Sequence, residues 1–369
     1  MRRLRFDLLA LCAVLSILGP AVAGPAVADA VADVAPARSD ESAALPQTHL
    51  RIVGGLAGIA QYTRYEAPFW TRHLKETSGG RVTAEVAPFD QSGIQGREML
   101  RLLSLGVISF GTVLPSASTE DPELAALDLP LVSPDFATLR RVVTAYRPHV
   151  QRFLRERYGL ELLAVYTYPA QVLYCRQAFR SLGDLRGRRV RTSGVSQAEL
   201  VEALGGIPVV TPFAEIVSAV QRNVVDCAIT GTLSGNSIGL HEVTSHVHDM
   251  AISWGVSLFA ANGGAWRALP PAVRELLQSE VAGLEAEIWE GAERETAEGQ
   301  ACNAGMVPCT IGRPGRMTRV PLSSEDIGRR PALIATAVLP GWLARCGNAC
   351  ADAWNRSIGP LLSIPAPRE

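Results

Sequence analysis

The sequence has little lysine, little net charge and no apolar run long enough to cross a membrane. Lys75 is the only lysine among 35 basic residues, so arginine carries almost all of the positive charge. Acidic and basic residues nearly cancel, which leaves a formal net charge of −1. This balance gives no indication of a nucleic-acid partner or of an anionic membrane surface. The apolar run 8–18 is shorter than the roughly 20 residues that a transmembrane helix needs.

Signatures of catalysis and of metal binding are also missing from the predicted elements. We predict no phosphate-binding loop, no dinucleotide-binding glycine motif and no serine nucleophile elbow. His241 and His246 suggest a metal cluster, but they are five residues apart, whereas a helical zinc motif places its histidines four apart. We therefore predict no metal, no cofactor and no enzyme activity, with an exported α/β hydrolase as the alternative.

The first 28 residues have the features of a secretory signal peptide. A basic start at Met1–Arg5 precedes the apolar run, and two Ala-x-Ala sites follow at 21–23 and 26–28. The segment 29–48 is rich in alanine, proline and aspartate without periodicity, which predicts a disordered linker. The remaining length of about 320 residues suggests two domains.

Apolar patterning alternates between strand-like and helix-like segments through the rest of the chain. This alternation predicts an α/β fold with mostly parallel sheets. The predicted strands are 49–55, 81–87, 107–113, 161–166, 171–176, 188–192, 207–210, 224–230 and 257–261. The predicted helices are 61–77, 95–105, 136–146, 150–158, 196–204 and 265–300.

Five short motifs follow one another between Ser181 and Thr230. They read D-L-R-G, R-V-R, L-G-G-x-P, P-F-x-E and A-V-Q-x-x-V-V-D. In this order and at this spacing, they resemble the solute-binding subunit of tripartite ATP-independent periplasmic (TRAP) transporters, the DctP family. The resemblance covers about His49 to Ile364.

The resemblance implies a type II-like periplasmic binding protein with two domains and a long helix that spans both. Domain I would comprise 49–170 plus 257–297, and domain II would comprise 171–256 plus 298–369. Such a protein would capture an organic acid in the cleft between the domains and deliver it to the TRAP membrane permease. A sensor module that has lost transport is a further alternative.

The resemblance also places two arginines at the solute. Arg191 ends the predicted strand 188–192 at the position of the family's carboxylate-binding arginine. A planar guanidinium can bind both oxygens of a carboxylate at once, which lysine cannot do. Arg176 matches a second basic contact, and a hinge salt bridge is its alternative role.

Four further residues are candidates for contact with the bound solute. Gly55 ends a strand where a ligand can approach the backbone closely. Phe213 and Trp254 could pack on the solute's carbon skeleton, and a place in the core is the alternative for both. Thr230 stands where the family often has an asparagine, so we expect a hydroxyl contact there. Leu114 and Pro115 replace an acidic residue of sialic-acid-binding relatives, which disfavours a polyhydroxylated sugar acid.

Six of the seven cysteines follow the predicted signal peptide, and export permits disulfides. Cys302 and Cys309 flank a short loop and are the first predicted pair. Cys346 and Cys350 could pair with each other or elsewhere. Cys175 and Cys227 are either buried thiols or a pair, and the sequence does not decide between these possibilities.

Overall fold

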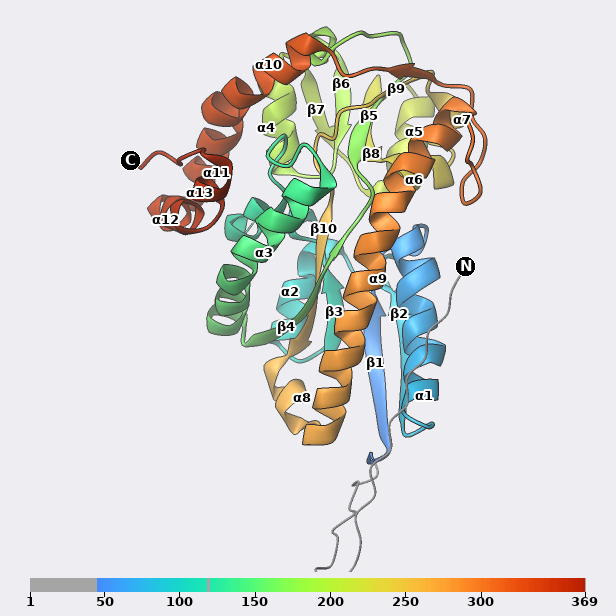
Figure 1. Ribbon diagram of the computed structural model, residues 1–369, viewed down its shortest axis with the longest axis vertical. Coiled ribbons are helices and arrows are strands. Elements are labelled where there is room, and N and C mark those ends of the chain that lie inside the picture. Colours follow the sequence, from blue (N-terminus) through green and yellow to red (C-terminus); the bar gives the residue numbers. More distant parts are fainter. Residues whose placement is uncertain (1–44, 118–119, 369) are drawn as a thin grey trace, which may run out of the picture. The chain divides into compact units, whose positions relative to one another are not determined.

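Two mixed β-sheets organise the chain in the computed structural model, which describes residues 45–117 and 120–368 (Figure 1). The predicted signal peptide and the predicted linker up to residue 44 lie outside the described residues. The rest of the predicted linker leads directly into strand β1, which begins at Thr48.

The first sheet has the strand order β2-β1-β3-β10-β4. β1 is parallel to β2 and β3, whereas β10 is antiparallel to β3 and β4. The strands are β1 (Thr48–Gly54), β2 (Val82–Pro88), β3 (Phe110–Val113), β4 (Leu160–Thr167) and β10 (Val256–Asn262). β10 enters this sheet only after the chain has formed five of the six strands of the second sheet, which makes β10 a return crossing.

The second sheet has the strand order β11-β9-β5-β8-β6-β7. β6 is parallel to β7 and β8, and β9 is parallel to β11, whereas β5 is antiparallel to β8 and β9. The strands are β5 (Gln171–Cys175), β6 (Arg189–Thr192), β7 (Ile207–Val210), β8 (Cys227–Gly231), β9 (His246–His248) and β11 (Thr318–Val320). Both sheets are therefore mixed, within the α/β class that the sequence predicts.

Helices flank both sheets. They are α1 (Leu74–Thr77), α2 (Met99–Ser104), α3 (Phe136–Phe153), α4 (Val195–Ala203), α5 (Ile216–Gln221), α6 (Thr232–Ser237), α7 (Leu240–Val243), α8 (Gly263–Ala268), α9 (Pro271–Ala304), α10 (Ser324–Leu333), α11 (Leu339–Cys346), α12 (Asn348–Arg356) and α13 (Ile358–Leu362). The segment predicted as one helix at 61–77 is helical, but most of it is π-helix, at Gln61–Glu66 and Phe69–His73.

Three predicted boundaries differ from the structure. β3 begins at Phe110 and not at 107, because the backbone N–H groups of Val107 and Ile108 still bond to Leu102 O at the end of α2. The two helices predicted at 136–158 form one continuous helical segment, with Pro148 inside α3. The helix predicted from residue 265 is divided at Pro270, so α9 begins at Pro271.

The long helix α9 contacts both sheets, as the fold prediction expected (Figure 1). Its first half buries Val273, Leu277 and Leu284 in the core of the first sheet. At Trp289 the indole Nε1 donates to Val165 O of β4 over 2.8 Å. Near its end, Asn303 Nδ2 donates to the hydroxyl of Tyr174 on β5 over 2.8 Å. One helix thus joins the layers of both sheets.

The C-terminal helices do not stay with the second sheet. α12 and α13 contact α3, and α11 contacts both α4 and the helical turn Pro122–Asp128. Trp342 Nε1 on α11 donates to Pro122 O over 2.6 Å. The segment 298–369, which the sequence assigns to the second domain, therefore also packs on elements of the first.

Three disulfides are formed in the structure. Cys175–Cys227 joins β5 to β8, Cys302–Cys309 closes the loop after α9, and Cys346–Cys350 joins α11 to α12.

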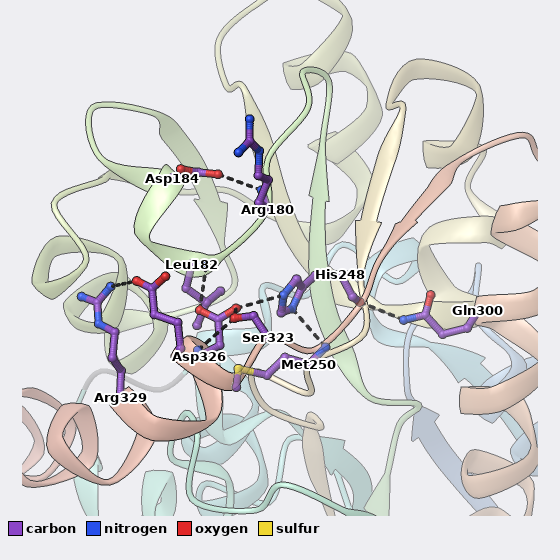
Figure 2. Close-up of polar contacts among 10 residues, drawn as sticks. Arg180, Leu182, Asp184, His248, Met250, Gln300, Ser323, Asp326 and Arg329 are labelled. Atoms are coloured by element: carbon purple, nitrogen blue, oxygen red, sulfur yellow. Dashed lines mark hydrogen bonds and ion pairs between the residues drawn. The ribbon is translucent and has the colours of Figure 1, made fainter.

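A buried polar cluster attaches α10 to the second sheet (Figure 2). Asp326, in the first turn of α10, accepts hydrogen bonds from Leu182 N and from the Ser323 hydroxyl, over 2.9 and 2.8 Å. Its Oδ2 also lies 3.4 Å from His248 Nε2 on β9. Burial lowers the pKa of His248, and the charge of Asp326 opposes this effect. The neutral imidazole and the carboxylate together fix the start of α10.

Replacing Asp326 with alanine should therefore destabilise the fold by about 2 kcal/mol, because buried hydrogen-bond donors lose a charged acceptor. The matched control is Glu325→Ala, which removes a neighbouring exposed carboxylate that pairs with Arg329 over 3.4 Å. The control should change the free energy of unfolding by less than about 0.5 kcal/mol. Denaturant unfolding measures both values, and equal losses would contradict the assigned role of Asp326.

Candidate functional site

A cavity of about 50 Å³ lies between loops of the two sheets. Its walls come from the segment after β3 and the turn before Leu129 on one side, and from the start of α4 on the other. The residues that line it are Pro115, Ser116, Leu124, Ala125, Leu127, Asp128, Ser193, Gly194, Val195, Ser196, Gln197, Ser253, Val256 and Arg345. The two walls meet closely at Gly194, where a Cβ atom would lie 2.5 Å from Ser116 O. Any larger residue at Gly194 would push the walls apart.

Gln197 connects the α4 wall to the strands that cross between the sheets. Its Oε1 accepts from Ser193 N over 2.9 Å. Its Nε2 donates to Gln171 Oε1 over 2.7 Å and to the Ser253 hydroxyl over 2.8 Å. Gln171 is the first residue of β5, and Ser253 pairs with it in an isolated antiparallel bridge. The buried amide group of Gln197 therefore holds the α4 wall of the cavity at a fixed position relative to Gln171 and Ser253, which lie where the chain crosses between the sheets.

Asp128 supplies a carboxylate to the opposite wall. It accepts hydrogen bonds from the backbone N–H groups of Trp254 and Gly255, both over 2.7 Å. Burial raises the pKa of Asp128 to about 7, and the two backbone bonds only partly oppose this shift. The group therefore changes its charge near neutral pH and fixes the start of β10.

Arg191 is buried at the end of β6, with 4% of its surface exposed. Its Nε donates to Thr211 O over 2.9 Å and its Nη1 to Ile229 O over 2.8 Å. Among the residues that the structure describes, no carboxylate lies within 4.0 Å of its guanidinium. Burial lowers the pKa of Arg191 to about 9, so the group remains charged at neutral pH. It is a buried cation held only by neutral carbonyls.

Arg189, on the same strand, differs from Arg191 because its charge is paired. Arg189 lies two residues earlier on β6, on the same face of the strand, and forms a two-pronged ion pair with Asp226, over 3.0 and 2.8 Å. Arg191 is not one of the cavity-lining residues, but its strand leads two residues later into the cavity wall at Ser193.

The other predicted residues occupy varied positions. Thr230 is buried on β8, next to the carbonyl that Arg191 binds. Phe213 is partly buried and packs on the core. Trp254 is buried, with its Nε1 bonded to Ser133 O over 2.9 Å and its ring edge-on to Phe136. Gly55 donates its N–H to the buried carboxylate of Glu66 over 2.7 Å. None of these four lines the cavity.

Arg176 and Arg191 are not brought together. β5 runs antiparallel to β8, so its first residue pairs with Gly231 and its last residue with Cys227. Arg176 therefore lies at the edge where β6 and β8 begin, opposite the edge that leads to Ser193. It is exposed, and its guanidinium contacts Asn223 Oδ1. The basic side chain predicted as a second ligand contact belongs to a different surface.

The sequence analysis missed the cavity residues Asp128, Gln197 and Ser253, and also Gln171, which does not line the cavity but accepts a hydrogen bond from Gln197. A signal existed for Asp128, because an acidic residue interrupts the otherwise apolar run Leu127–Leu131. The same holds for Gln171, which is the only polar residue of β5 apart from its tyrosine hydroxyl and its cysteine. Gln197 and Ser253 carry no comparable signal.

The sequence analysis predicts no serine nucleophile elbow, but the sequence does contain the letters of that motif. Residues 235–239 read G-N-S-I-G and match the letters of a serine nucleophile elbow. Such an elbow places its serine on a sharp turn from strand to helix. Here Ser237 is the last residue of α6, and its hydroxyl donates to Leu233 O over 3.0 Å. The structure therefore does not arrange this serine as a nucleophile.

Glu66 is a second buried carboxylate in the first sheet's layer. Besides Gly55 N, it accepts from Gln61 Nε2 over 2.6 Å and, more weakly, from the Thr112 hydroxyl over 3.5 Å. Burial raises the pKa of Glu66 to about 7, despite the three hydrogen bonds that oppose the shift. The folded protein therefore binds a proton here more tightly than the unfolded chain does.

This difference in pKa predicts a pH-dependent contribution to stability. A folded pKa above the unfolded value stabilises the fold at low pH, and the contribution is lost as pH rises towards about 7. Glu66→Gln, which cannot ionise, should therefore become more stable relative to the native chain between about pH 5 and pH 8, by about 2 to 3 kcal/mol. Denaturant unfolding at several pH values measures this difference. A difference in the free energy of unfolding between Glu66→Gln and the native chain that stays constant with pH would contradict the raised pKa of Glu66.

Two α/β layers that are joined by crossing strands and by one long helix, with a cavity between them, have the architecture of binding proteins that close on a ligand by hinge bending. The family model of bacterial extracellular solute-binding protein, family 7 (DctP) matches residues 60–307. The chain belongs to this family. Within the described residues, no helix has both the length and the apolar character that crossing a membrane requires.

Named relatives agree with this assignment. The chain is 26% identical to the C4-dicarboxylate-binding periplasmic protein DctP of Rhodobacter capsulatus over 56% of this chain and 62% of that protein. It is 23% identical to the ectoine-binding periplasmic protein TeaA of Halomonas elongata over 53% of this chain and 59% of that protein. The matched regions thus span about three fifths of these relatives.

A solved structure shows the same fold. It is DctP7 of Bordetella pertussis, an extracytoplasmic solute receptor binding pyroglutamic acid. The comparison gives a TM-score of 0.73 at 22% identity and covers 84% of this chain and 98% of that one.

Proposed function

We propose that this chain is the extracytoplasmic solute receptor of a TRAP transporter, exported to the periplasm by its N-terminal signal peptide. It captures a small organic acid between the layers of its two sheets and delivers the acid to the membrane permease. The names of the relatives support the solute class, since they include receptors for a C4-dicarboxylate and for pyroglutamic acid. The proposed role is transport and not catalysis.

The observation that carries this proposal is the buried guanidinium of Arg191. A buried charge is costly unless an opposite charge accompanies it. Two carbonyls orient this guanidinium, but they do not neutralise it. A carboxylate supplied by a solute would provide the missing negative charge and fit the planar fork.

The cavity suggests how the rest of the solute is held. Ser193, Gln197 and Ser253 line a space of about 50 Å³, which is much smaller than the pockets of about 300 to 1,000 Å³ that hold small-molecule ligands, so the solute would enter only when this space widens. Binding proteins of two layers joined by crossing strands admit their ligands by hinge bending. A hinge movement of the strands that cross between the two sheets would move the two layers apart. The cavity and the end of the second sheet near Arg191 would then form one site.

A thermal-shift screen of organic acids tests the proposal. We expect one or more small carboxylic acids to raise the melting temperature of the native chain, and calorimetry to give a matching affinity. Uncharged analogues of the same size should have no effect. A ligand that binds equally well with its carboxylate replaced by an uncharged group would refute the proposed anion site.

A further inference from the structure

A basic edge lies on the second sheet, opposite the edge that leads to the cavity. We define it by four exposed arginines and two exposed apolar residues, namely Arg176, Arg180, Arg186, Arg222, Ile207 and Val224. β6, β7 and β8 begin at this edge, and antiparallel β5 ends there.

Hydrogen bonds and side-chain contacts place these residues around one end of the sheet. Arg176 N bonds to Asp226 O, just before β8, and the Arg176 guanidinium contacts Asn223 next to Arg222. The Arg186 side chain lies over Gly205, which is two residues before Ile207. In Figure 2 the Arg180 side chain points away from the buried His248–Asp326 cluster.

The basic edge is positively charged on balance. In the part of the chain that the structure describes, none of its four arginines has a carboxylate within 4.0 Å, whereas Arg189 nearby is paired with Asp226. The acidic groups beside the edge include Asp184, which accepts from Arg180 N over 2.7 Å, Glu202, and Asp226, whose carboxylate pairs with Arg189 and also interacts with the charge of Arg176. With Arg189 counted, five guanidinium groups face these three carboxylates.

Two branched apolar side chains stand among these arginines. Ile207 is 52% exposed at the start of β7, and Val224 is 46% exposed next to Asn223. Two such residues do not supply the apolar centre that a stable protein interface needs. Exposed aliphatic groups surrounded by arginine do suit a layer of lipid headgroups, where cations attract anionic lipid and apolar groups insert shallowly.

We propose that the basic edge binds the anionic phospholipid surface of a membrane. Docking through this edge would turn the opposite edge of the sheet, and with it the cavity, away from the membrane, so the bound protein would take up solute there and leave the surface before it delivers the acid to the permease. The inference goes beyond solute capture and does not depend on the identity of the acid. Arg191→Ala should bind vesicles as the native chain does, so failure of one proposal is separable from failure of the other.

Vesicle flotation with the exported chain tests the inference. The vesicles contain phosphatidylcholine alone, or phosphatidylcholine with phosphatidylglycerol. We expect binding only to the anionic vesicles at about 10 mM salt, and loss of binding at about 1 M salt, where the screening length falls from about 30 Å to 3 Å. Equal binding to both vesicle types, or no binding to either, would overturn the proposal.

A triple variant, Arg176→Gln with Arg186→Gln and Arg222→Gln, locates the surface. It should lower the partition onto anionic vesicles by about 100-fold, since each arginine near such a surface contributes about fivefold. The matched control replaces three exposed arginines of the first sheet's layer, Arg72, Arg97 and Arg101, with glutamine. The control should bind almost normally, and an equal loss in both triple variants would reject the basic edge as the docking surface.

A second variant keeps the test independent of the arginines. Ile207→Ser with Val224→Ser leaves the charge unchanged, so we expect weaker binding to anionic vesicles with an unchanged dependence on salt. Unaltered binding by this variant would contradict the insertion of the two apolar side chains. Melting curves of each variant without vesicles verify that it is folded.

Discussion

Replacing Arg191 with alanine should lower the affinity for the solute acid by about 30-fold to several thousand-fold, which is the usual cost of truncating one partner of a buried charge pair. The guanidinium is 4% exposed and already oriented by Thr211 O and Ile229 O. Its charge has no protein counterpart within reach among the described residues. The solute carboxylate is therefore expected to lose its principal partner.

Two further variants separate charge from geometry. Arg191→Lys keeps the positive charge but loses the planar fork, so its affinity should fall between those of the native chain and Arg191→Ala. Arg189→Ala removes an arginine from the same strand, but one whose charge is already paired with Asp226. Calorimetric titration of all four proteins is the measurement. Equal affinities for Arg191→Ala and Arg189→Ala would reject the role of Arg191.

Replacing Gly299 with alanine should destabilise the fold by at least about 3 kcal/mol, at the upper end of the usual cost of overpacking. Gly299 lies on α9, where α6 approaches it. A Cβ atom there would lie 2.3 Å from Leu233 N and 2.6 Å from the Thr232 carbonyl carbon. These are backbone atoms that cannot rotate away, so the two helices would have to separate.

The control lies in the same helix. Gly283 is exposed, and a Cβ atom there would meet nothing within 4 Å. Gly283→Ala should stabilise the fold by up to about 1 kcal/mol, because alanine is the better helix former. Unfolding in denaturant compares the two variants with the native chain. A stable Gly299→Ala protein would mean that α6 and α9 do not pack as closely as described.

The sequence was sufficient to predict elements whose apolar pattern is strong. The order of most strands and helices, the α/β class and the helix that contacts both sheets follow from periodicity and from the resemblance, whereas the three-residue strands β9 and β11 were not predicted. Arg191 was identified because its position in the R-V-R motif matches that of the family's carboxylate-binding arginine. The strand ends agree within a few residues where turns and glycines define them.

Tertiary packing determined what the sequence did not reveal. The antiparallel direction of β5 places Arg176 at the far edge of its sheet, and a local pattern does not specify strand direction. Asp128 and Gln197 acquire their roles through backbone partners distant in sequence, such as Trp254 and Ser253. The net charge of −1 conceals the segregation of arginines on the basic edge.

The most direct test of the central claim compares an acid identified in the screen with its carboxamide. The two molecules have nearly the same shape and differ in charge. Isothermal titration of both, with the native chain and with Arg191→Ala, gives the coupling between the carboxylate and the guanidinium. We predict that the native chain strongly prefers the acid and that Arg191→Ala loses this preference. An undiminished preference for the acid in Arg191→Ala would show that another group binds the negative charge.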